Sequence, residues 1–307
     1  MASELLERIL LSAPPVMAFD RTGRRCAGMD SDNLERWLTT MRPRLHAFCG
    51  RMMGSAIDGE DVVQEALARA AAAYADADPA QPEAWLFRIA RNAAIDALRQ
   101  RRGATADPTD QEETPDPRAD SAARAEVTLG FTAFLPLPPP QRASVVLVDV
   151  LGYSLAETAT ILETSVAAVK ATLHRGRSRL ADPPEPAPIS EQEKLRLRAY
   201  ADLFNARAFD ALRDLLAAEV QLVMPPNIRR DGKQDVSIYY ARYSDAPVAW
   251  RMDVALIDGR PALLATDPAD PQTRFPVLLD WSDGRIVAIR DFHYARYVMD
   301  GIAIARI

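Results

Sequence analysis

The stretch WLFRIARNAAIDALRQRR, Trp85 to Arg102, predicts a helix with one apolar face and one basic face. The apolar residues that recur at helical spacing are Leu86, Ile89, Ala90, Ala93 and Ala97. A separate stripe is formed by Arg88, Arg91, Asn92, Arg99 and Arg102. Such a helix buries one side and offers the other to phosphates and base edges. An isolated basic stripe is more often the solvated face of an ordinary helical bundle, so the function of this helix depends on its neighbours.

Two further patterns flank this helix. Upstream lies DGEDVVQEALARAAAAY, Asp58 to Tyr74, in which an apolar stripe alternates with an outward face formed by Asp61, Gln64 and Glu65. Downstream lies a helix-turn-helix pattern that ends in LHRGRSRL, Leu173 to Leu180. These three pieces, in this order and at this separation, resemble region two and region four of bacterial sigma factors of the extracytoplasmic-function (ECF) type. The resemblance covers roughly residues 32–180.

The resemblance implies roles for both helices of region two. DVVQEAL looks like the family segment that docks on the clamp helices of the polymerase β′ subunit, which implies a polymerase-binding role for Asp61, Gln64 and Glu65. From the residues alone, a solvated acidic face explains them equally well. The basic helix is implied to hold the minus-ten promoter element and help open it, because cationic contacts and a base pocket offset the cost of unstacking. The residues for this step are Arg88, Arg91, Asn92 and Arg99.

The helix-turn-helix pattern has its own start signals. Ser154 and Glu157 fit a capping box before SLAETATIL, and Ser165 fits the N-cap of SVAAVKATLHRGRSRL. On the second helix Lys170, His174 and Arg177 form a stripe beside the buried one, where a helix in the major groove presents its readers. Arg175 projects elsewhere, towards phosphates. The resemblance implies that this module reads the minus-thirty-five element and meets the polymerase β flap, although basic residues near a helix C-terminus also favour the macrodipole.

Two residues depart from the family pattern. Glu163 stands where the turn residue is usually Gly, and Ala168 stands where Thr usually precedes the Val of the recognition helix. Both leave the base preference open.

Composition sets limits on the class of protein. The 307 residues are 48% hydrophobic and 26% charged, as in a globular protein. The sequence lacks an apolar run long enough for a bilayer and a signal-peptide pattern at its start, which predicts a cytoplasmic protein without membrane contact. Cys26 and Cys49 lack metal-ligand spacing. The net charge of −6 coexists with local basic clusters, which suggests weak DNA binding alone and stronger binding inside a larger complex.

The chain is expected to divide into modules and linkers. An unassigned extension (1–30) precedes region two (31–103), and an acidic flexible linker (104–128) leads to region four (129–181). A proline-rich linker (182–190) then precedes a third domain (191–307). Within region two, Pro43 is expected to open a second helix.

The third domain opens with helical patterns and continues with strand-like runs. We expect a helix at 235–243, strands near 250–257, 262–266, 275–281 and 286–294, and hairpin turns at Asp258-Gly259 and Asp283-Gly284. FNARAFDALRDLL followed by VMPP resembles the SnoaL-like branch of the NTF2-like fold. Relatives of that fold include isomerases, hydratases and cyclases with an Asp or His base in an apolar cup.

The polar groups that a cup would use are Tyr200, Asp291, His293 and Tyr294. On one strand Asp291 and His293 share a face and Tyr294 takes the other, so only one set can line a cup. Catalysis, sensing of an unidentified small ligand and an intramolecular regulatory contact all remain open, and we favour the last.

The sequence therefore predicts a multidomain fold: two all-α helical sigma modules, a region 2 bundle and a region 4 helix-turn-helix, followed by an α+β NTF2-like/SnoaL-like cone. The predicted function is that of a non-enzymatic ECF-type sigma factor, without cofactor or metal. Its partners would be core RNA polymerase and promoter DNA, and its third domain would contact and regulate the sigma modules. The alternatives are a helix-turn-helix regulator independent of polymerase, and a SnoaL-like small-molecule enzyme or sensor with an attached DNA-binding half.

Overall fold

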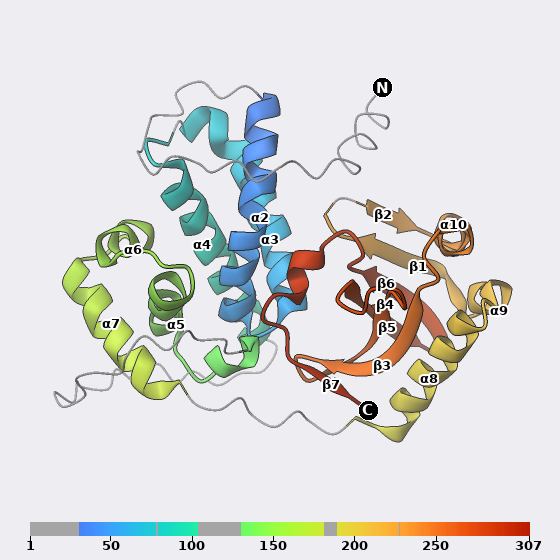
Figure 1. Cartoon of the computed structure of the whole chain (residues 1–307). Helices are drawn as coiled ribbons and strands as arrows, with labels where there is room; N and C mark the ends of the chain where they lie inside the picture. The colour runs from blue at the N-terminus through green and yellow to red at the C-terminus, as the bar shows by residue number, and fades with distance from the viewer. Residues whose placement is uncertain (1–30, 78, 104–129, 181–188, 227) are drawn as a thin grey trace.

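The computed structural model describes residues 31–77, 79–103, 130–180, 189–226 and 228–307. The expectations for the N-terminal extension, the acidic linker and most of the proline-rich linker lie outside the described residues. Figure 1 shows a central helical bundle, a helix-turn-helix unit on one side of it, and a C-terminal domain (residues 189–307) with a curved sheet on the other.

The bundle consists of α2 (Ser31–Met53), α3 (Ala56–Ala77) and α4 (Pro82–Gly103). Pro43 lies inside α2, so the expectation that it opens a new helix was wrong. Its missing N–H costs one helical hydrogen bond. However, the buried side chains of Leu38 and Met41 before it and of Leu45 after it continue one apolar stripe, and this packing outweighs the local preference.

Helices α2 and α3 cross at two glycines. A Cβ atom on Gly59 would lie 2.4 Å from the Cα atom of Gly50, closer than real Cβ contacts allow. A Cβ atom on Gly50 would lie equally close to the ring of Phe131. The close approach of the two helices therefore depends on Gly59 lacking a side chain, and Gly50 leaves room for Phe131.

The helix-turn-helix unit (residues 130–180) contains the elements η1 (Phe131–Phe134), α5 (Pro139–Val145), η2 (Val146–Val150), α6 (Leu155–Leu162) and α7 (Val166–Arg179). The predicted caps are confirmed. Ser154 and Glu157 form both bonds of a capping box, and the Ser165 side chain accepts a hydrogen bond from the Ala168 N–H. Glu163 ends α6 in the left-handed conformation, with φ of 54°.

The bundle and the helix-turn-helix unit share one continuous apolar core. Arg142, buried in α5, links them. Its guanidinium group donates to the carbonyls of Leu135 and Leu137, both at 2.8 Å, and to the carbonyl of Met52 in the last turn of α2. The bond to Met52 satisfies a carbonyl group that the end of α2 leaves free.

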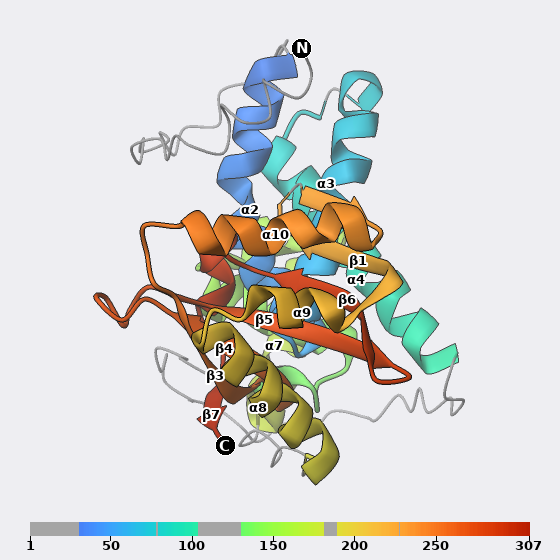
Figure 2. The same cartoon turned by 90° about the vertical axis from the view of Figure 1, so that its right-hand side faces the viewer.

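The C-terminal domain packs three helices on one face of a seven-stranded sheet (Figure 2). The helices are α8 (Glu191–Asn205), α9 (Phe209–Asp214) and α10 (Lys233–Asp245). The strands are β1 (Leu216–Met224), β2 (Ile228–Asp231), β3 (Arg251–Ile257), β4 (Arg260–Thr266), β5 (Arg274–Ser282), β6 (Arg285–Asp291) and β7 (Ile304–Arg306). Their order is β2-β1-β6-β5-β4-β3-β7, antiparallel except for β1 with β6.

Most of the strand predictions hold. The two Asp-Gly turns join β3 to β4 and β5 to β6, with Asp258 and Asp283 at φ of 49°. The last predicted strand was too long, because β6 ends at Asp291. There the His293 N–H donates to the Asp291 carboxylate (2.8 Å), and this local turn leads the chain away from the sheet towards η3 (Arg296–Met299).

The glycine crossing gives a direct test. Gly59→Ala should destabilise the protein by about 1–3 kcal/mol through overpacking, even though Ala is favoured over Gly in a helix by about 1 kcal/mol. Gly130→Ala is the matched control, because its backbone φ is −57° and its added Cβ would make ordinary contact at 3.6 Å. Urea unfolding of both variants measures the difference, and equal stability would exclude steric crowding at the crossing.

Candidate functional site

The basic stripe of α4 divides into a covered half and an exposed half. Arg88 forms an ion pair with Glu163 of the helix-turn-helix unit at 2.5 Å, and the Arg91 guanidinium reaches the Leu162 carbonyl at 3.5 Å. Asn92 and Arg99 are exposed. Half of the predicted minus-ten residues therefore contact the module predicted to read the other promoter element.

A second cluster holds α4 and the helix-turn-helix unit together. Glu83 accepts hydrogen bonds from Arg44 at 2.5 Å and from the Tyr153 hydroxyl. The Tyr153 ring also packs edge-on against Phe87, with ring centroids 5.4 Å apart. The sequence contained no signal for this cluster, because its members are separated by many residues and each looks like an ordinary surface side chain.

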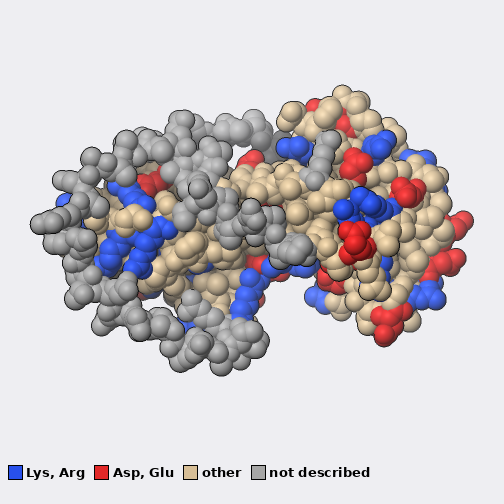
Figure 3. All heavy atoms as spheres, turned by 90° about the horizontal axis from the view of Figure 1, so that it is seen from below, with Lys and Arg blue, Asp and Glu red and all other residues tan. Residues whose placement is uncertain are grey.

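The recognition helix α7 keeps its outer face open. Lys170 and His174 are exposed, and Arg175 is half-buried. Arg177 differs, because its guanidinium group donates to both carboxylate oxygens of Asp149, at 2.9 and 2.6 Å. This hydrogen bonding raises the pKa of Arg177, with burial acting in the opposite direction. Lys and Arg side chains gather at the end of the molecule that holds this unit, whereas they alternate with acidic ones over the C-terminal domain (Figure 3).

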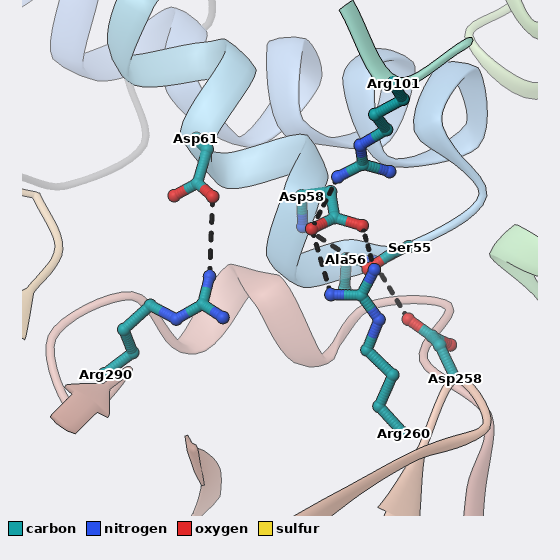
Figure 4. A network of polar contacts seen from close by, with 8 residues as sticks. All are labelled: Ser55, Ala56, Asp58, Asp61, Arg101, Asp258, Arg260 and Arg290. Atoms are coloured by element: carbon teal, nitrogen blue, oxygen red, sulfur yellow. Dashed lines mark hydrogen bonds and ion pairs between the residues drawn. The ribbon is translucent and has the colours of Figure 1, made fainter. Parts of the chain in front are cut away.

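The predicted polymerase-binding face of α3 is partly engaged inside the molecule. Asp61 lies 3.5 Å from Arg290 of β6 (Figure 4), whereas Glu65 pairs with Arg69 one turn along α3 at 2.7 Å. Gln64 is half-buried. Burial raises the pKa of Asp61, and Arg290 opposes that shift.

The start of α3 is held by the β3–β4 hairpin of the C-terminal domain (Figure 4). The Asp258 carboxylate accepts the Ala56 N–H at 2.9 Å and the Ala303 N–H at 3.0 Å. Asp58 receives Arg260 through two bonds, at 3.0 and 2.6 Å, and also pairs with Arg101 of α4 at 2.8 Å. The sequence predicted Asp258 only as a turn residue, because a helix cap from a distant segment leaves no local pattern.

Three parts of the molecule meet at His46 of α2. Its Nε2–H donates to the Ala56 carbonyl (2.8 Å), and the ring packs edge-on against Phe131 and Tyr297, with centroids 5.8 and 5.4 Å away. Burial lowers the pKa of His46 from its ordinary 6.5 to about 4, and Arg51 and Arg42 act in the same direction. Nearby, burial raises the pKa of Glu60 to about 7, although Arg42 pairs with it.

The predicted cup residues lie at different depths. Asp291 is fully buried and accepts hydrogen bonds from the hydroxyls of Tyr239 (2.8 Å) and Tyr243 (2.6 Å). Tyr200 is also fully buried, 3.2 Å from the Tyr240 hydroxyl. Burial raises the pKa of Asp291 and of all four tyrosines.

The other two predicted cup residues lie nearer the surface. His293 is half-buried among aromatic rings, and Tyr294 is 39% exposed. A separate surface groove of about 600 Å³ lies between α8 and β3, with Arg198, Asn205 and Arg251 among its lining residues.

Within the described ranges, no three His, Cys, Asp or Glu side chains are placed to hold a metal ion. In the same ranges, no helix has both the length and the apolar character to cross a membrane.

Comparison with known proteins identifies two segments and several relatives. Residues 37–104 match the Sigma-70 region 2 family, and residues 133–180 match the Sigma-70, region 4 family. The ECF RNA polymerase sigma factor SigG of Mycobacterium tuberculosis is 35% identical over 73% of this chain and 69% of its own length. SigM of the same species, also an ECF sigma factor, is 37% identical over 45% of this chain and 70% of its own.

Among solved structures, the extracytoplasmic function sigma factor SigJ of M. tuberculosis matches 87% of this chain and 98% of its own. The sequence identity is 20% and the TM-score is 0.34.

The His46 contact predicts a loss of stability in acid. The unfolded chain binds a proton at His46 below pH 6.5, whereas the folded chain binds it only near pH 4, so stability falls as the pH drops through this window. At 1.36 kcal/mol per pH unit, the contribution lost at pH 5 is about 2 kcal/mol. Urea unfolding at pH 7 and pH 5 should show a smaller acid loss for His46→Gln than for the unchanged chain. An identical loss in both would show that His46 stays unprotonated in the unfolded state or is solvated in the folded one.

Proposed function

The chain belongs to the ECF RNA polymerase sigma factors, and from this premise we propose how its surfaces divide the work of binding core polymerase and directing promoter-specific initiation. The outward face of α3 docks on the β′ clamp helices through Asp61, Gln64 and Glu65. Exposed carboxylates on a rigid helix suit a basic partner surface. The observation that carries this proposal is that Glu65 is exposed and that its ion pair lies within its own helix.

The minus-ten element is assigned to α4. Asn92 and Arg99 are exposed and available to DNA without any rearrangement. Arg88 and Arg91 join them once the helix-turn-helix unit moves away from α4. Arginines contribute electrostatic affinity for the strand, and Asn92 offers donors and acceptors suited to a base edge.

The minus-thirty-five element is assigned to α7. Lys170 and His174 project from its exposed face, as readers in a major groove do, and Arg175 contacts phosphates. Arg177 also belongs to this DNA-reading surface. Its two hydrogen bonds to Asp149 fix its guanidinium group beside the exposed face of α7. The unit as a whole also meets the polymerase β flap.

The C-terminal domain regulates these steps by an intramolecular contact. Arg290 pairs with Asp61 on the face assigned to polymerase, and Asp258 and Arg260 hold the start of the same helix. The domain thus competes with polymerase for α3. A structural role is favoured over catalysis or ligand sensing, because Tyr200 and Asp291 are spent on internal hydrogen bonds.

Charge reversal at Glu65 tests the polymerase contact. Glu65→Lys should weaken binding to core RNA polymerase at least tenfold, because it places a like charge against a basic partner. Asp210→Lys, at an exposed position of the C-terminal domain, is the control for the change in net charge. Binding is measured by co-purification and titration with the intact chain. If Glu65→Lys retains full polymerase affinity, or if the intact chain binds promoter DNA specifically without polymerase, the chain acts through another surface.

Removing the competing cation tests the regulatory contact. Arg290→Ala should strengthen core polymerase binding by about two- to fivefold, since a partly exposed ion pair contributes up to about 1 kcal/mol. Arg251→Ala, another β-strand arginine but in an exposed pair with Asp253, should leave binding unchanged. If Arg290→Ala binds core polymerase with unaltered affinity, the Arg290–Asp61 pair does not compete with polymerase binding.

A further inference from the structure

Glu163 occupies a backbone position that disfavours its residue type. At φ of 54° it ends α6 in the left-handed conformation, which Gly adopts freely and a residue with a Cβ does not. A non-glycine residue keeps such a conformation where the surrounding structure supports it. The Glu163 side chain forms an ion pair with Arg88, which joins two modules.

The surroundings of Glu163 form an anionic pole directed at α4. The C-terminal end of α6 carries the negative end of the helix dipole, and its Leu162 carbonyl accepts from Arg91. The Glu163 carboxylate adds a full negative charge beside it, 2.5 Å from Arg88. A carboxylate next to carbonyl oxygens offers two arginines the same chemistry as a phosphate backbone.

We propose that Glu163 is an internal substitute for a DNA phosphate, a positioning residue that occupies Arg88 and thereby lowers the affinity of α4 for the minus-ten strand. The inference rests on the proposed assignment of Arg88 to that strand. The contact with the helix-turn-helix unit engages only Arg88 and Arg91 of the basic stripe, since Asn92 and Arg99 are exposed. Glu163 therefore sets how strongly DNA is held and leaves a site for first contact.

The geometry of a promoter requires this contact to break. The two promoter elements are roughly 25 base pairs apart, which is about 85 Å of duplex at about 3.4 Å per base pair. In this structure α4 and the turn before α7 touch, so α4 and α7 cannot reach both elements at once. Binding to both elements must break the Arg88–Glu163 pair. The free energy of that pair therefore makes promoter binding weaker by the same amount.

Two substitutions separate the charge from the backbone. Glu163→Gln keeps the side-chain length and the left-handed strain but removes the charge, whereas Glu163→Gly removes the charge and the strain together. Asp210→Asn makes the same change in net charge on α9 of the C-terminal domain, where its partner is Arg213. All are made in the full chain, and the probe is fluorescein-labelled single-stranded DNA of random sequence.

We expect Glu163→Gln and Glu163→Gly to bind the probe equally and about two- to fivefold more tightly than the unchanged chain, the range of a half-exposed ion pair. Asp210→Asn should bind as the unchanged chain does. The difference should disappear near 1 M salt, where the Debye length falls to about 3 Å.

Two results would overturn the proposal. Tighter binding by Glu163→Gly alone would trace the effect to backbone strain, and no change in either variant would show that Arg88 is already available to DNA. Arg88→Ala distinguishes a failure of the Glu163 proposal from a failure of the assignment of Arg88 to the minus-ten strand. If Arg88→Ala weakens probe binding while Glu163→Gln has no effect, α4 keeps its role and only the phosphate substitute is wrong. If Arg88→Ala has no effect even when it is combined with Glu163→Gln, which leaves Arg88 without that carboxylate, Arg88 is not a DNA contact and both ideas fall.

Discussion

The first free N–H groups of α3 impose the constraint on which the arrangement of this protein depends. A helix that starts inside a molecule must find acceptors for these groups. Here the Asp258 carboxylate, from a hairpin some two hundred residues away in the sequence, accepts the Ala56 N–H. Because the same carboxylate also bonds to Ala303, it fixes α3, the hairpin and the last strand relative to one another. The helix assigned to polymerase is thus completed by the domain assigned to its regulation.

Much of the fold could be predicted because its signals are local. Ser154, Glu157 and Ser165 mark helix starts through bonds that span three residues, and Asp-Gly pairs mark two hairpins. Prediction failed where packing between residues distant in the sequence determines the secondary structure. Pro43 was read as a helix boundary, yet the apolar stripe on both sides of it packs as one. The short edge strands β2 and β7 went unnoticed because pairing, and not their own pattern, defines them.

The candidate surfaces were predictable as charge patterns but not as contacts. The basic stripe predicts that Arg88 and Arg91 interact with a negatively charged group. It does not predict whether that group is DNA, Glu163 or the C-terminal end of a helix. Asp61 and Arg177 illustrate the same limit, since each has an internal partner far along the chain. Conversely Asp291 looked like a base for a cup, and its depth became visible only with the tyrosine hydroxyls that surround it. These assignments stay predictions until the measurements are made.

The position of Phe131 has a consequence for how the chain divides into domains. Its ring belongs to the core of the C-terminal domain, together with Ala56 and Ile57 of α3, although all three residues precede that domain in the sequence. The domain boundaries along the sequence and the boundaries of the hydrophobic cores therefore do not coincide. Without the C-terminal domain these apolar side chains would lose part of their packing, although the ring of Phe131 would keep its contact with His46 of α2. The apolar surface of the sigma modules is in this sense matched to the domain that follows them in the chain.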